Sequence, residues 1–333
     1  MLVLLEIKEK LVKIYGKYEV YITPLFRFLL GVVTFTLINA NIGYMKMLST
    51  MPIALILAAI CSVLPVNAMI TLAAIVVLVN LYALALEVFV VGALIFAFIY
   101  FIYYRFSPRY GYNAVLMPVC FKLGIPYVVP IGSGLLGEMY SVISVVCGSV
   151  VYFFLKGVHE NEATLSSASD IETSATSKIT ITLNQLLMNK EMFLVIGIFA
   201  IATIVVYLIR RLDIDNAWTI AWIAGILIEI IGLLSGYLLL GISGKVFGVL
   251  LGGGVSAVLA WVLQFVFFNV DYTRTERLQF EDDEYYYYVK AIPKLVVTGF
   301  DKQVKHIHKN DDKERLAKKK FAEELDIDEE LLN

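Results

Sequence analysis

Apolar stretches long enough to cross a bilayer alternate with short polar segments from residue 25 to residue 268. A spanning helix needs about 20 mostly apolar residues. The pattern therefore predicts an all-α integral membrane protein with about eight transmembrane helices and one irregular segment between the fourth and the fifth. The predicted spans are 25–41, 47–64, 67–82, 87–104, 138–156, 192–209, 217–240 and 245–268.

The irregular segment, 112–137, is apolar but carries Pro118, Pro126, Pro130 and four glycines. Proline removes a backbone donor and clashes with the preceding turn, so one straight helix is not expected here. Broken backbone at membrane depth is tolerated only inside protein or beside a watery cavity, and transporters place binding sites at such breaks. We therefore expect a re-entrant segment at 112–136, with a binding site there.

Basic residues decide how this segment runs. Cytoplasmic loops carry an excess of Lys and Arg. If 112–136 dips in and returns, Arg109, Arg211 and Arg277 all fall on the cytoplasmic side, and both termini are cytoplasmic. If the segment crosses fully, the arginine pair at 210–211 faces outward. We favour eight spans with the re-entrant path; nine spans remain the alternative.

Two polar regions flank the spans, and a third interrupts them. Residues 1–24 predict an amphipathic helix that either lies in the membrane interface or packs on the protein's own loops, because apolar residues recur at spacings of three and four. Residues 157–190 predict a Ser/Thr-rich extracellular loop. Residues 269–333 predict a charged cytoplasmic tail, with a strand near 285–297 whose edge could pair with a partner.

The composition indicates the environment and the partners of the chain. The chain is 59% hydrophobic and 17% charged, with a mean hydropathy of +0.79, which exceeds the values of soluble domains. We expect a multi-pass protein of the cell membrane whose first partner is the lipid bilayer. The tail mixes both signs of charge, so nucleic acid is not an expected partner. A homo-oligomer, or a subunit held by the tail, is the other partner expectation.

Ionisable residues inside apolar segments are functional candidates, because burying them is expensive. Glu229 lies in the middle of 217–240, Lys122 near the tip of the broken segment, and Glu138 where that segment meets the next span. Ser133 belongs to GSGLLG (132–137), which matches a dinucleotide fingerprint but lacks the strand that such a site requires. The glycines either expose backbone amides or simply form a turn.

Small residues recur every four positions in the last span and so share one helix face. These are Gly244, Gly248, Gly252, Ser256 and Ala260. Such a face lets another helix approach closely, as membrane helices require. We expect it to pack on the preceding span, 217–240; a homodimer face is the alternative.

No catalytic or metal-binding motif is present, and the three cysteines are far apart, so we expect no metal or cofactor; an intramembrane enzyme is a third alternative, the least favoured.

The tail DYTRTERLQFEDDEYYYYVKAIPK, with LPVNA, YRFSP and IPYVVPIGSGLLG, resembles integral membrane proteins of clostridial-type Gram-positive bacteria. This resemblance implies no known activity, and it suggests a bacterial cytoplasmic membrane.

Two functions fit these observations. The broken segment with its intramembrane charges predicts a transporter or permease-like protein. The long tail and the absence of recognisable chemistry would fit a membrane scaffold or complex subunit. A cavity that reaches the broken segment favours the transporter, whereas solid packing there favours the scaffold.

Overall fold

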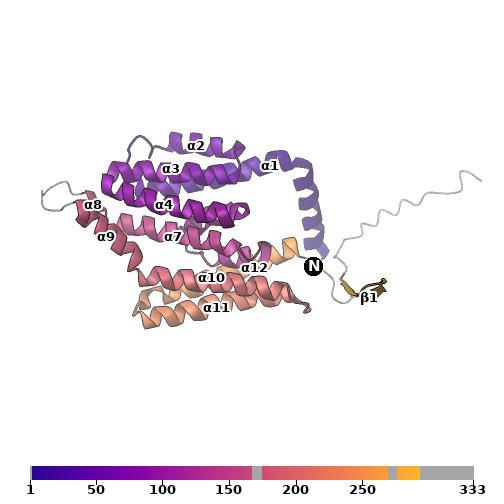
Figure 1. Ribbon diagram of the computed structural model, residues 1–333. Helices are drawn as coiled ribbons and strands as arrows, with labels where there is room; N and C mark the ends of the chain where they lie inside the picture. The colour runs from indigo at the N-terminus through magenta and orange to yellow at the C-terminus, as the bar shows by residue number, and fades with distance from the viewer. Residues whose placement is uncertain (1, 167–174, 269–275, 293–333) are drawn as a thin grey trace, which may run out of the picture. The chain divides into compact units, whose positions relative to one another are not determined.

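The computed structural model describes residues 2–166, 175–268 and 276–292, and the described chain is almost entirely helical (Figure 1). The helices of the first half are α1 (Leu2–Ile42), α2 (Met51–Val63), α3 (Val66–Leu84), α4 (Leu86–Phe106), the 3₁₀ turn η1 (Pro108–Tyr110), α5 (Gly111–Lys122) and α6 (Val128–Leu136). Those that follow are α7 (Ser141–Glu160), α8 (Glu162–Ser166), α9 (Ala175–Leu187), α10 (Lys190–Arg210), α11 (Ala217–Leu239), η2 (Ser243–Lys245) and α12 (Val246–Phe267). Two strands, β1 (Glu276–Glu281) and β2 (Tyr286–Ala291), complete it.

Within the described residues, seven helices are long and apolar enough to cross a membrane. Large apolar side chains on their outer faces stay exposed, such as Leu94, Phe98 and Phe101 on α4. Faces of this kind are stable against lipid rather than water. The chain is therefore a membrane-embedded protein built from α-helices.

The expected second span is shorter than the sequence indicates. Helix α2 has 13 residues and begins only at Met51. At 1.5 Å per residue it extends about 20 Å, less than the roughly 30 Å of a hydrocarbon core. In the part of the chain that the structure describes, seven long helices and the short α2 thus stand where eight full spans are expected.

The amphipathic helix 1–24 and the span 25–41, which we expect to be separate, do not divide at residue 24. Helix α1 continues through Pro24 as one element, and its bend lies at Tyr18, where the backbone is non-helical (φ −116°, ψ 18°) (Figure 1). Proline can be held inside a helix when only its own hydrogen bond is lost. The amphipathic segment and the first span are therefore one kinked helix.

The expected polar loop 157–190 is largely helical. Helix α7 runs on to Glu160, and α8 and α9 follow at the end of the neighbouring helices (Figure 1). Leu165, Ile181 and Leu186 pack into one core with Phe154 and Val158 of α7. These apolar residues are scattered among serines and threonines, so composition hides their shared face.

The strand expected near 285–297 is found at Tyr286–Ala291 and ends before Pro293. It pairs antiparallel with β1, with Leu278 opposite Val289. Lys290 Nζ lies 3.2 Å from an oxygen of Asp213 and 3.0 Å from one of Asp215, both in the segment between α10 and α11. These carboxylates raise the pKa of Lys290 through hydrogen bonds and charge. The rest of the expected tail, 269–275 and 293–333, lies outside the described residues.

Candidate functional site

The broken segment forms a helical hairpin of α5 and α6. Its turn is a helix-ending motif in which the Gly124 N–H donates to Phe121 (3.2 Å) and the Ile125 N–H donates to Cys120 (2.9 Å). Gly124 adopts φ +76°, a conformation that glycine reaches without strain. Pro126 then prevents the helix from resuming at once.

The two ends of the hairpin lie side by side. Asn113 Nδ2 donates to Ser133 Oγ (2.9 Å), and the Glu138 N–H donates to the Tyr110 hydroxyl (3.1 Å). The Ser133 hydroxyl also lies 2.8 Å from that of Ser141. The chain thus leaves α6 close to where it enters α5.

Each arm of the hairpin packs on a different set of helices. Helix α5 lies along α7, where Gly148 faces Met117 and the ring of Phe121 stacks on Tyr152 (4.1 Å between centroids). Helix α6 faces α10, because a Cβ at Gly134 would lie 2.8 Å from the Thr203 carbonyl. The hairpin therefore lies between the earlier and the later helices of the chain.

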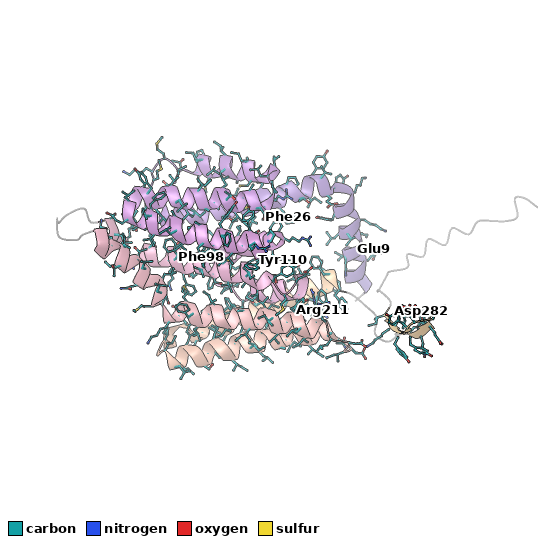
Figure 2. The ribbon with its side chains drawn as sticks, viewed as in Figure 1. Glu9, Phe26, Phe98, Tyr110, Arg211 and Asp282 are labelled. Carbon is teal, nitrogen blue, oxygen red and sulfur yellow. The ribbon has the colours of Figure 1, made fainter. Side chains whose placement is uncertain are left out.

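Arg210, the last residue of α10, holds the exposed end of α6. Its guanidinium donates to the carbonyls of Leu135 and of Gly137 (3.0 Å for the latter). The last carbonyls of any helix lack hydrogen-bond donors inside the helix, and the Arg210 side chain provides these donors for α6. Figure 2 shows its neighbour Arg211 and Tyr110 toward the same end of the helices.

A cavity of about 760 Å³ borders the other arm; we call it the α5 cavity. Helices α1, α3 and α4 line one side, and α5 and α7 line the other. From α5 its lining includes Ala114, Val115, Pro118, Val119 and Lys122. The broken segment is thus one wall of a space large enough for a sizeable molecule.

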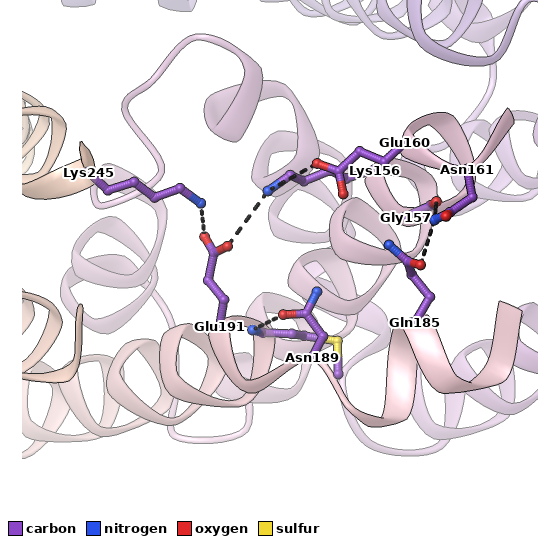
Figure 3. Close-up of polar contacts among 9 residues, drawn as sticks. Lys156, Gly157, Glu160, Asn161, Gln185, Asn189, Glu191 and Lys245 are labelled. Atoms are coloured by element: carbon purple, nitrogen blue, oxygen red, sulfur yellow. Dashed lines mark hydrogen bonds and ion pairs between the residues drawn. The ribbon is translucent and has the colours of Figure 1, made fainter. Parts of the chain in front are cut away.

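An ionic network lies at the C-terminal end of α7 (Figure 3). The carboxylate of Glu191 pairs with Lys245, and its second oxygen lies 3.7 Å from Lys156. Lys156 is also 3.7 Å from Glu160. Glu191, at the start of α10, is half-buried between two cations and thereby links α7, α10 and the start of α12.

The four predicted site residues do not come together. Lys122 is exposed and lines the α5 cavity, whereas Glu138 is exposed at the opposite end of the hairpin. Ser133 is buried within its hydrogen bonds to Asn113 and Ser141.

Glu229, the fourth, does not line the cavity; it lies on α11, which packs against α6. Its side chain is 1% exposed, and neither carboxylate oxygen has a hydrogen-bond partner among the described residues. The Tyr127 hydroxyl of the hairpin lies within electrostatic reach of it. A buried carboxyl without a hydrogen-bond donor is costly when ionised, so Glu229 carries a desolvation cost inside the bundle.

The predicted face of small residues divides in two. Gly252, Ser256 and Ala260 are buried, and Gly252 abuts Tyr127 and the Gly124 carbonyl of the hairpin. A Cβ at Gly244 or Gly248 would meet nothing within 4 Å. The close approach at Gly252 is thus made by the hairpin, while the neighbouring Gly253 faces Ile230 of α11.

Sequence reasoning missed Glu191, both contacts of Arg210 with the end of α6, and the cavity. From the sequence, Arg210 could be used only to predict topology, because no local pattern shows that the end of α6 lies beside it. Glu191 stands at a predicted helix start, where an acidic residue is ordinary. Among the described residues no group of His, Cys, Asp and Glu could hold a metal ion, and the three cysteines are free and buried.

Comparisons of the chain with protein-family models, with curated proteins and with solved structures gave no match.

Proposed function

We propose that the chain is a transporter or permease-like protein of the cell membrane whose substrate path follows the α5 cavity. In this proposal the α5–α6 hairpin enters the membrane from the cytoplasmic side and returns to it, and both termini are cytoplasmic. The adjoining ends of the hairpin at Tyr110 and Glu138 support this path. So does Arg210, a basic residue at that same end.

The observation that carries the proposal is the cavity itself. A scaffold gains stability when its helices pack without voids, because empty space forfeits contacts. Here about 760 Å³ lies open beside α5, one arm of the hairpin that we propose to be re-entrant. Irregular backbone beside a cavity is the arrangement that membrane transporters use.

A scaffold or complex subunit is the second candidate, and the strand pair favours it. Tyr285, Tyr286, Tyr287 and Tyr288 are all exposed. Tyrosine carries a large apolar surface with a polar tip and is common at protein interfaces. A partner could pair with an edge of this two-stranded sheet.

Filling the cavity separates the two candidates. Ala97 of α4 lines the cavity, whereas Leu94 on the same helix is exposed and does not. Ala97→Trp should abolish complementation in cells that lack the protein while its abundance stays normal. The control Leu94→Trp should complement fully. Full complementation by a stably expressed Ala97→Trp would refute the permease proposal and favour the scaffold.

A further inference from the structure

Charged groups gather at one end of the α5 cavity. Helices α5 and α7 run in the same direction, since Met117 faces Gly148 and Phe121 stacks on Tyr152 further along both helices. Their C-terminal ends therefore adjoin. Lys122 from α5 and Lys156, His159 and Glu160 from α7 all line the cavity at this end.

The body of the cavity is apolar. Between the charged end and Tyr103, its lining is mainly aliphatic and aromatic, including Leu37, Val77, Phe96, Val115 and Val151. Cavity-lining residues on α7 run from Cys147 to Glu160, which is about 20 Å of helix. One leaflet of the hydrocarbon core is about 15 Å thick. The space thus has the length and polarity of a lipid acyl chain.

The basic residues at the charged end differ in whether they have an acidic partner. Lys156 is held by Glu160 and Glu191, and His159 Nδ1 lies 3.8 Å from a Glu162 oxygen. Lys122 forms no hydrogen bond or ion pair with any residue in the described part of the chain. One free ammonium group thus stands where an apolar cavity ends. This is the arrangement that an anionic headgroup with an attached chain would complement.

We infer that the α5 cavity binds an anionic glycerophospholipid of the surrounding bilayer, with one acyl chain in the cavity and the headgroup phosphate at Lys122. This inference rests on the proposed permease and gives its substrate class. It also excludes small ions and sugars as cargo for this path, because the apolar body offers them no partners in place of water.

Photocrosslinking tests this inference on the whole chain. The protein is reconstituted in phosphatidylcholine vesicles that contain a trace of diazirine-labelled phosphatidylglycerol or diazirine-labelled phosphatidylcholine. Crosslinks are mapped by mass spectrometry. We expect labelled phosphatidylglycerol on cavity-lining residues of α4, α5 and α7, at about five times the yield of labelled phosphatidylcholine. Ala97→Trp should remove both.

Lys122→Gln should bring the two yields together, and Lys122→Arg should keep the preference. Lys46→Gln is the matched control, because Lys46 is exposed in the segment between α1 and α2 and lies outside the cavity lining. Equal yields of both lipids in the unaltered protein, or a preference that survives Lys122→Gln, would overturn the headgroup site.

The absence of any cavity crosslink would overturn lipid binding altogether. Neither result would decide the permease proposal, because complementation by Ala97→Trp tests that proposal separately.

Discussion

Replacement of Gly252 by alanine tests how closely α12 approaches the hairpin. A Cβ at this position would overlap the Tyr127 ring and would lie 2.8 Å from the Gly124 carbonyl oxygen. Tyr127 is only 8% exposed, and the Gly124 carbonyl is part of the backbone of the hairpin turn. Neither the packed ring nor the backbone carbonyl can move aside easily, and overpacking of this kind lowers the free energy of unfolding by about 1–3 kcal/mol.

Gly248→Ala provides the reference, because it makes the same substitution one turn earlier on α12, where a Cβ meets nothing within 4 Å. Alanine is a better helix former than glycine by about 1 kcal/mol. Both variants share this gain, so it cancels in their comparison. Gly252→Ala should therefore be less stable than Gly248→Ala by about 1–3 kcal/mol.

The assay is reversible unfolding of the purified protein in mixed detergent micelles, followed by circular dichroism. Equal stability of the two variants would refute the close approach of α12 to the hairpin turn.

Three further predictions concern single side chains. Arg210→Gln leaves the carbonyls of Leu135 and Gly137 without their donor and should cost about 1–3 kcal/mol in the same unfolding assay. Arg211→Gln removes only an exposed hydrogen bond to the Tyr207 hydroxyl and should cost far less. Asn189→Ala removes the side-chain cap that accepts the Met192 N–H at 3.0 Å, and we expect a loss of about 1 kcal/mol. Glu229→Leu removes a buried carboxyl that has no hydrogen-bond partner among the described residues and should stabilise the fold by about 1–3 kcal/mol. If the carboxyl couples transport to a proton, Glu229→Gln should abolish complementation at normal abundance; full complementation by Glu229→Gln would exclude that role.

The sequence predicts the long helices well because hydropathy reports the solvent that each segment meets. The spans expected at 87–104 and 192–209 differ from α4 and α10 by one or two residues at each end. It also predicts where the chain breaks, because proline and glycine act on the backbone locally. The break at 123–127 lies inside the segment where it was expected.

The candidate site could not be predicted to the same degree, because it depends on contacts between distant residues. Lys122 and Lys156 adjoin the same cavity only because α5 and α7 run parallel, and neither segment carries a pattern that reveals the other. For Glu229 the sequence predicts the candidate but not its surroundings. Its place in the middle of an apolar span made it a candidate, but only the three-dimensional packing shows that it is buried and does not line the cavity.

The most direct test of the account is the membrane side of the two hairpin ends. Single cysteines replace Arg109 and Met139, both exposed, in a chain without Cys61, Cys120 and Cys147. Ser166→Cys reports the side of the segment after α7, which the re-entrant path places outside the cell. A membrane-impermeant maleimide on intact cells should label Ser166→Cys, and it should label Arg109→Cys and Met139→Cys only after permeabilisation. External labelling of Met139→Cys with protection of Arg109→Cys would show that the segment crosses the membrane, and would contradict the re-entrant path that the permease proposal includes.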